Sequence, residues 1–134
     1  MKIEMSPKKV KVEIPDYGEF EVSPLGAGAE AELRMMFREL HELHEETEAY
    51  KQKPEYQEIA EKEKNGEKVD KNSEVYVKAM ELFKSVTDLA QKIEDKRIEK
   101  LLQVFKGKNV EKLFNDFTID QINEIYTKAT KEDE

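Results

Sequence analysis

The sequence predicts a mainly α-helical protein, in which an N-terminal β-hairpin is followed by four or five helices in a small bundle. Two observations predict this fold class. Over residues 8–22 apolar residues alternate with charged ones, as in strands that bury one face. From residue 29 onward apolar residues recur at spacings of three and four, the period of a helix with one buried stripe. With 134 residues, the chain 1–134 is predicted to be a single domain.

The hairpin is predicted over residues 8–22. Pro15, Asp16 and Gly18 supply turn chemistry, because proline presets φ, aspartate caps locally and glycine accepts a positive φ. An isolated hairpin is marginal in water, so its apolar face is expected to pack on the helices that follow. The apolar positions on that face are Val10, Val12, Ile14, Phe20 and Val22.

The main helical body is predicted over residues 29–107. A first helix should begin near Ala29 and end before Pro54, which can open a shorter helix. The polar, glycine-broken stretch near 62–72 reads as a mobile loop.

A long helix should follow, with Asn72 or Ser73 as its cap. Its apolar stripe continues to Phe105, and Gly107 ends it. One helix of that extent would be about 50 Å long, which a small domain rarely needs. We therefore expect a bend or break near Asp95; the alternative is that the helix projects to meet another subunit.

Short C-terminal helices are predicted over residues 109–129, and residues 130–134 form a frayed acidic tail. Asn109 is the expected cap of the first. Thr118 and Gln121 match the capping box for the last, whose inward positions are Ile122, Ile125 and Tyr126.

Composition narrows the function classes. The chain has 31 acidic and 23 basic residues, a net charge of −8, and no cysteine. Disulfides, thiolate metal sites and a cysteine nucleophile are therefore excluded. No segment is basic enough to follow a phosphate backbone, so no nucleic-acid partner is expected. No apolar run approaches the ~18 residues of a membrane span, and residues 1–6 lack the apolar stretch of a signal peptide. These features predict a soluble cytoplasmic protein with no membrane association.

Two short motifs suggest chemistry but lack the context for it. Residues 26–31 fit G-x-G-x-x-A, yet the strand before them is short and half polar and no second parallel strand follows. His41 and His44 lie three residues apart among glutamates, one residue short of the metalloprotease motif, with no third histidine or cysteine. Neither supports a cofactor, metal site or catalytic residue, and the sequence predicts that the protein is not an enzyme.

Two ends of the chain carry a family resemblance. The hairpin over 9–22, its exit Ser23-Pro24-Leu25-Gly26 and the helix over 30–48 form one part. The closing segment from Leu113 to Tyr126 forms the other. In this layout the chain resembles the tail assembly chaperones of long-tailed bacteriophages, which are small, acidic, mostly helical cytoplasmic proteins.

The resemblance implies a non-enzymatic role in virion assembly. Chaperones of this family bind the tape measure protein, keep its long hydrophobic helices soluble and recruit tail tube subunits. It implies that partners are bound through two apolar helical faces, which could equally be ordinary core. The residues expected there are Leu33, Met36, Phe37, Leu40, Tyr76, Met80, Phe83, Leu101 and Phe105.

Other functions remain open at this point. The chain could be a small acidic inhibitor, of the DNA-mimic or anti-defence type, that binds a basic protein groove through the glutamate-rich region 30–63. It could also be a structural head or tail component. Self-association is a further alternative, because the long apolar stripe holds more surface than a thin monomer needs.

Overall fold

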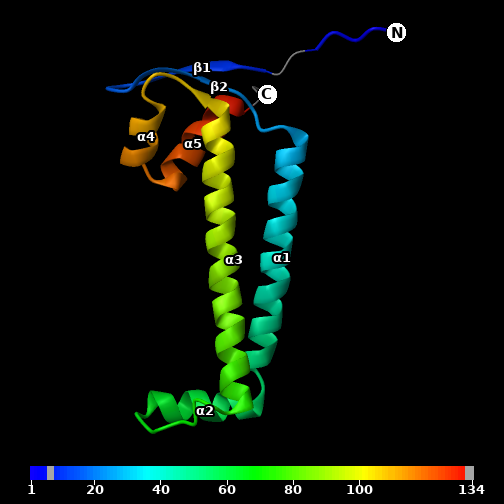
Figure 1. Cartoon of the computed structure of the whole chain (residues 1–134), viewed down its shortest axis with the longest axis vertical. Helices are drawn as coiled ribbons and strands as arrows, with labels where there is room; N and C mark the ends of the chain where they lie inside the picture. Colours follow the sequence, from blue (N-terminus) through cyan, green and yellow to red (C-terminus); the bar gives the residue numbers. More distant parts are fainter. Residues whose placement is uncertain (6–7, 132–134) are drawn as a thin grey trace. The chain divides into compact units, whose positions relative to one another are not determined.

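The computed structural model describes residues 1–5 and 8–131 (Figure 1). An N-terminal antiparallel hairpin is followed by five helices, which confirms the predicted fold class. The elements are β1 (Val10–Ile14), β2 (Gly18–Val22), α1 (Ala27–Lys51), α2 (Pro54–Lys64), α3 (Glu74–Val104), β3 (Phe105–Lys106), α4 (Val110–Asp116) and α5 (Ile119–Thr130).

Contacts divide the chain into two compact units. Unit 1 joins residues 1–33 to the chain from residue 94 onward, and unit 2 is the stretch 34–93. Helices α1 and α3 each contribute residues to both units. That the chain is a single domain stays a prediction.

The core of unit 1 lies between its small sheet and its C-terminal helices. In the hairpin, Val10 lies opposite Val22 and Ile14 opposite Gly18. As expected, the apolar face of the hairpin packs on helices, since both of its strands contact α5. The buried residues of this core are Ile14, Phe20, Val22, Leu101, Val104, Phe105, Leu113 and Ile122.

The sheet has a third strand that the sequence analysis missed. Helix α3 ends at Val104, and Phe105 pairs with Val22 instead of adding a last helical turn. The backbone N–H of Ser23 donates to the Val104 carbonyl (3.1 Å), which fastens the end of the helix to the hairpin. The strand order is therefore β1-β2-β3.

The predicted break near Asp95 is wrong. Helix α3 runs without interruption from Glu74 to Val104, a stretch that contains neither glycine nor proline. Sharp kinks in helices usually arise at glycine or proline, or where a group is inserted into the hydrogen-bond ladder. The apolar stripe restarts beyond Lys96, but a change in side-chain pattern does not by itself break the backbone.

Most helix ends lie at or near the residues where the sequence predicts them. Ser73 is the cap of α3, because its hydroxyl accepts a hydrogen bond from the Tyr76 N–H (3.2 Å). Pro54 opens α2, as predicted, and the link from α2 to α3 spans 65–73. Helix α1 begins at Ala27, two residues earlier than expected. That the link is mobile stays a prediction.

The C-terminal helices are held by one predicted and one unpredicted contact. The capping box of Thr118 and Gln121 is formed in both directions. Asn109 does not cap α4 with its side chain; its amide instead donates to the Tyr17 carbonyl in the hairpin turn (2.7 Å). Thr130, predicted to fray, still belongs to α5, and residues 132–134 lie outside the described part of the chain.

Candidate functional site

Two of the nine residues expected to meet a partner are exposed. Phe37 in α1 is 46% exposed and Met80 in α3 is 38% exposed. Two more large apolar side chains of unit 2, Met35 and Val77, are also exposed. The remaining predicted residues outside the core are half-buried: Leu33, Met36, Leu40, Tyr76 and Phe83.

Leu101 and Phe105 do not fit the prediction. Only 3% and 1% of their surfaces are exposed, and both belong to the core of unit 1. The edge of the Phe105 ring meets the Phe114 ring, with centroids 5.5 Å apart. Their place on the apolar stripe predicted to continue to Phe105 reflects ordinary core packing, so neither side chain is available to a partner.

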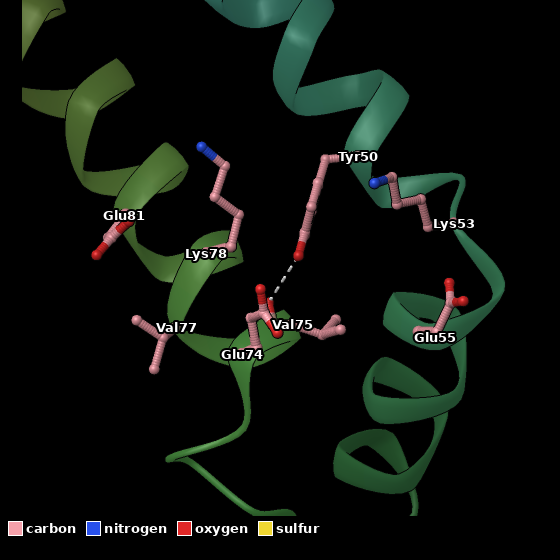
Figure 2. A pocket seen from close by; sticks show the side chains of 8 residues that line it. All are labelled: Tyr50, Lys53, Glu55, Glu74, Val75, Val77, Lys78 and Glu81. Atoms are coloured by element: carbon pink, nitrogen blue, oxygen red, sulfur yellow. Dashed lines mark hydrogen bonds between the residues drawn. The ribbon is translucent and has the colours of Figure 1, made fainter.

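An open pocket of about 760 Å³ lies in unit 2 where the end of α1, the start of α2 and the start of α3 meet (Figure 2). We call it the α3 pocket. Apolar carbon comes from Tyr50, Val75 and Val77, and both signs of charge surround it. Its lining residues are Tyr50, Lys53, Glu55, Glu74, Val75, Val77, Lys78 and Glu81.

Tyr50 holds two of these elements together. Figure 2 shows its ring reaching from the last turn of α1 to the first turn of α3, where the hydroxyl donates to the Val75 carbonyl (3.3 Å). Beside it, the Tyr56 ring of α2 lies 6.2 Å from the Phe83 ring, edge to face. The Lys51 ammonium lies 5.3 Å from the Phe83 centroid. One side of the pocket is therefore fixed by aromatic packing rather than by a flexible loop.

Charge in the α3 pocket is mixed. Glu55, Glu74 and Glu81 contribute carboxylates, and Lys53 and Lys78 contribute ammonium groups. The Lys53 ammonium also lies 4.9 Å from the centroid of the Tyr50 ring. A lining that mixes apolar carbon with charges of both signs suits a peptide segment that buries one apolar side chain and keeps its flanking charges in water.

A separate charged cluster lies in unit 1. Glu32 of α1 accepts hydrogen bonds from Lys100 (2.9 Å) and Lys96 (3.3 Å) of α3. The bond from Lys100, followed by that from Lys96, lowers the pKa of Glu32, and the bond to Glu32 raises the pKa of Lys96. The cluster links the two helices by charge.

The two motifs of the sequence have structural explanations. Gly26 precedes α1 and its carbonyl accepts from the Glu30 N–H, so Gly28 lies within the helix and no glycine loop forms. His41 pairs with Glu45 on the surface of α1, with 3.1 Å between Nε2 and Oε1. Within residues 1–5 and 8–131, no group of three or more His, Cys, Asp or Glu is arranged to hold a metal ion.

Comparison with known proteins gives no match to a family model, a curated protein or a solved structure. Among the helices of the described chain, none combines the length and the apolar character needed to cross a bilayer.

The α3 pocket was not found by sequence reasoning. Val75 and Val77 flank the predicted stripe residue Tyr76, and Tyr50 and Lys53 follow the end of the predicted α1 stripe. These segments meet where the end of α1, the start of α2 and the start of α3 come together. The periodicity of a single helix does not show which residues of another helix it will meet. The only local indication of the pocket was the pair of valines on either side of Tyr76.

Proposed function

We propose that this chain is a non-enzymatic chaperone of tail assembly in long-tailed bacteriophages, acting in the host cytoplasm. It would bind an apolar helical segment of the tape measure protein and recruit tail tube subunits. The observation that supports the proposal is the α3 pocket, with Val77 exposed in its wall and Met80 exposed one turn further along α3. The layout of hairpin and helices is the second support.

The chemistry of this region suits a client with apolar side chains at helical spacing. Val77 and Met80 lie three residues apart, so they share one side of α3. Methionine adapts to irregular apolar surfaces, which favours binding to several sites along a long, repetitive partner. The net charge of −8 adds self-repulsion that keeps a chaperone loaded with an apolar client from aggregating.

A different observation favours an acidic inhibitor as the second candidate. Glu39, Glu42, Glu45 and Glu46 are all exposed on α1. A row of carboxylates on a rigid helix could occupy a basic groove that normally holds a nucleic acid. Such binding would weaken steeply with salt, whereas an apolar contact would not.

The experiment is a pull-down with the tagged full chain from infected cells, read by mass spectrometry and repeated at about 1 M salt, where the Debye length is about 3 Å. Recovery of tape measure or tail tube protein at both salt concentrations is the expected result. Recovery of a nuclease or DNA-binding complex that high salt releases would favour the inhibitor. A chain that instead remains in the purified particle is a structural component.

Matched variants locate the contact. Val77→Ser combined with Met80→Ser should lower recovery of the client at least about tenfold, because each apolar side chain removed from a buried contact costs about 1–3 kcal/mol. Leu102→Ser is the control, since Leu102 is similarly exposed (39%) but lies on α3 in unit 1. Equal loss in the control, or none in the double variant, would place the client elsewhere.

A further inference from the structure

Strand β1 has one edge to which no strand is paired. In the sheet of unit 1 the order is β1-β2-β3, so β1 bonds to β2 alone within the described chain. The other edge presents backbone donors and acceptors that can pair with an added strand. Near this edge Val10 and Val12 are only half-buried, although Ile14 at the other end of the strand is buried.

The first five residues have the pattern of a strand but are not in a sheet. Met1, Ile3 and Met5 alternate with Lys2 and Glu4, so in extended form the segment has one apolar and one charged face. All three apolar side chains are exposed, Ile3 by 69%. Figure 1 draws this segment, in dark blue, outside any strand.

We propose that two copies of this chain associate by strand addition, in which Met1–Met5 of each copy pairs antiparallel with the free edge of β1 in the other. Each molecule then carries both halves of the contact, the projecting strand and the open edge, as a two-fold symmetric interface requires. Within the described chain this segment pairs with no strand and β1 pairs with β2 alone, so both the segment and the edge are open to a second copy.

The apolar pattern fixes the register. Setting Ile3 opposite Val12 brings the other two apolar residues of the segment against apolar residues of β1. All three then extend the face that packs on the core of unit 1, and they cover the half-buried valines. The apolar pairs are Met1 with Ile14, Ile3 with Val12, and Met5 with Val10.

Charge fixes the direction. In the antiparallel arrangement Lys2 lies opposite Glu13, and Glu4 lies opposite Lys11, so both charged pairs are of opposite sign. A parallel strand with the same central pair would set Lys2 against Lys11 and Glu4 against Glu13. Like charges directly opposite each other are destabilising in a sheet, so only the antiparallel pairing satisfies both faces.

Cysteine cross-linking tests the register directly, because the natural chain contains no cysteine. A Glu4→Cys protein is mixed with a Lys11→Cys protein of different mass and oxidised. Opposite Cβ atoms in such a pair lie about 5 Å apart, close enough to form a disulfide with slight adjustment. The control mixture is Lys2→Cys with Lys11→Cys, which are opposite only in a parallel pairing.

The expected result is a covalent heterodimer at least about tenfold more abundant in the first mixture than in the control. Equal yields in the two mixtures, or no heterodimer in either, would overturn the proposal.

The oligomeric state provides the second test. The unmodified chain should be a dimer by light scattering, and Ile3→Asp should raise its dissociation constant at least about tenfold. Leu102→Asp, which puts the same charge at another exposed apolar site of unit 1, should leave the dimer intact. A chain that is monomeric at all concentrations overturns the proposal, as does a dimer that tolerates Ile3→Asp. The result is independent of the proposed chaperone function, because neither assay involves a client.

Discussion

Gly107 lies where no side chain fits. A Cβ atom there would be 2.6 Å from Cδ1 of Phe20 and 3.0 Å from the Glu19 carbonyl oxygen. Gly107→Ala should therefore lower the free energy of unfolding by roughly 1–3 kcal/mol, because the Phe20 ring, itself in the core, must move. Chemical denaturation measures this change.

The matched control is Gly28→Ala. A Cβ at Gly28 meets no atom within 4 Å, and the residue lies in α1. Alanine favours the helix over glycine by up to about 1 kcal/mol, so this variant should be as stable as the natural chain or more so. A Gly107→Ala protein as stable as the Gly28→Ala protein would show that the chain near Phe20 moves freely.

Thr118 stabilises the start of α5 through the capping box. Thr118→Ala should cost about 1 kcal/mol in the free energy of unfolding, since the N–H of Gln121 loses its acceptor. Thr127→Ala, on an exposed position of the same helix, should be neutral or slightly stabilising because alanine is the better helix former. Comparing the thermal unfolding of the two variants separates the effect of losing the cap from the effect of helix propensity.

At the scale of the elements, Glu32 makes the contact between α1 and α3 in unit 1 dependent on pH. Its pKa is lowered from the ordinary value of 4.5 by Lys100 and Lys96. The unfolded chain therefore binds this proton at a higher pH than the folded chain does. The stabilisation is complete above the unfolded value and is lost as pH falls through the lower, folded value.

Glu32→Gln removes this pH-dependent stabilisation. The free energy of unfolding of the variant should therefore decrease less steeply as the pH is lowered below about 4.5. The comparison is a series of urea titrations from neutral pH downward. Lys100→Gln should shift the same loss towards higher pH, because it removes the hydrogen bond that lowers the pKa of Glu32 most. Identical acid profiles for all three proteins would contradict the assignment.

How well the elements could be predicted depended on where their determinants lie. The capping box and the proline start of α2 are encoded within four residues, so the sequence predicts them well. Strand β3 has only two residues and exists because residues 105–106 pair with 21–22, which no local pattern reveals. Asn109 has the composition of a cap, but its amide is used by the hairpin turn 92 positions earlier.

For the candidate site as well, features encoded locally could be predicted and features that depend on tertiary contacts could not. Phe37 and Met80 were included in the expected partner surface because an apolar stripe can be read from spacing, and both are exposed; their contact with a partner stays a prediction. Leu101 and Phe105 lie on a stripe as well, and spacing alone cannot distinguish a stripe that meets the core from one that meets a partner. The α3 pocket depends on a meeting of three helices, which is a property of the tertiary structure.

At the scale of the whole molecule, α3 runs through the boundary between the two units near residue 94. Glu94→Pro should therefore destabilise both units, by about 3 kcal/mol or more, because proline removes a hydrogen bond of the ladder and clashes with the preceding turn. Glu74→Pro is the matched control, since the first position of a helix tolerates proline. Hydrogen exchange read separately for residues of each unit gives the result.

If Glu94→Pro increases exchange in one unit and leaves the other unchanged, the continuous helix does not couple their stability. If the control destabilises as much as Glu94→Pro, the effect comes from the substitution itself and not from the interruption of α3.

The pairing of β2 with β3 also has a consequence for the order in which the protein forms during synthesis. Unit 2 is one uninterrupted stretch, 34–93, so it can fold as soon as it leaves the ribosome. The hairpin is made before unit 2, yet its core partners are made only with residues 101–122. The hairpin is thus translated well before it can be buried, and until then its apolar face is open to any chaperone of the cell or to a neighbouring nascent chain.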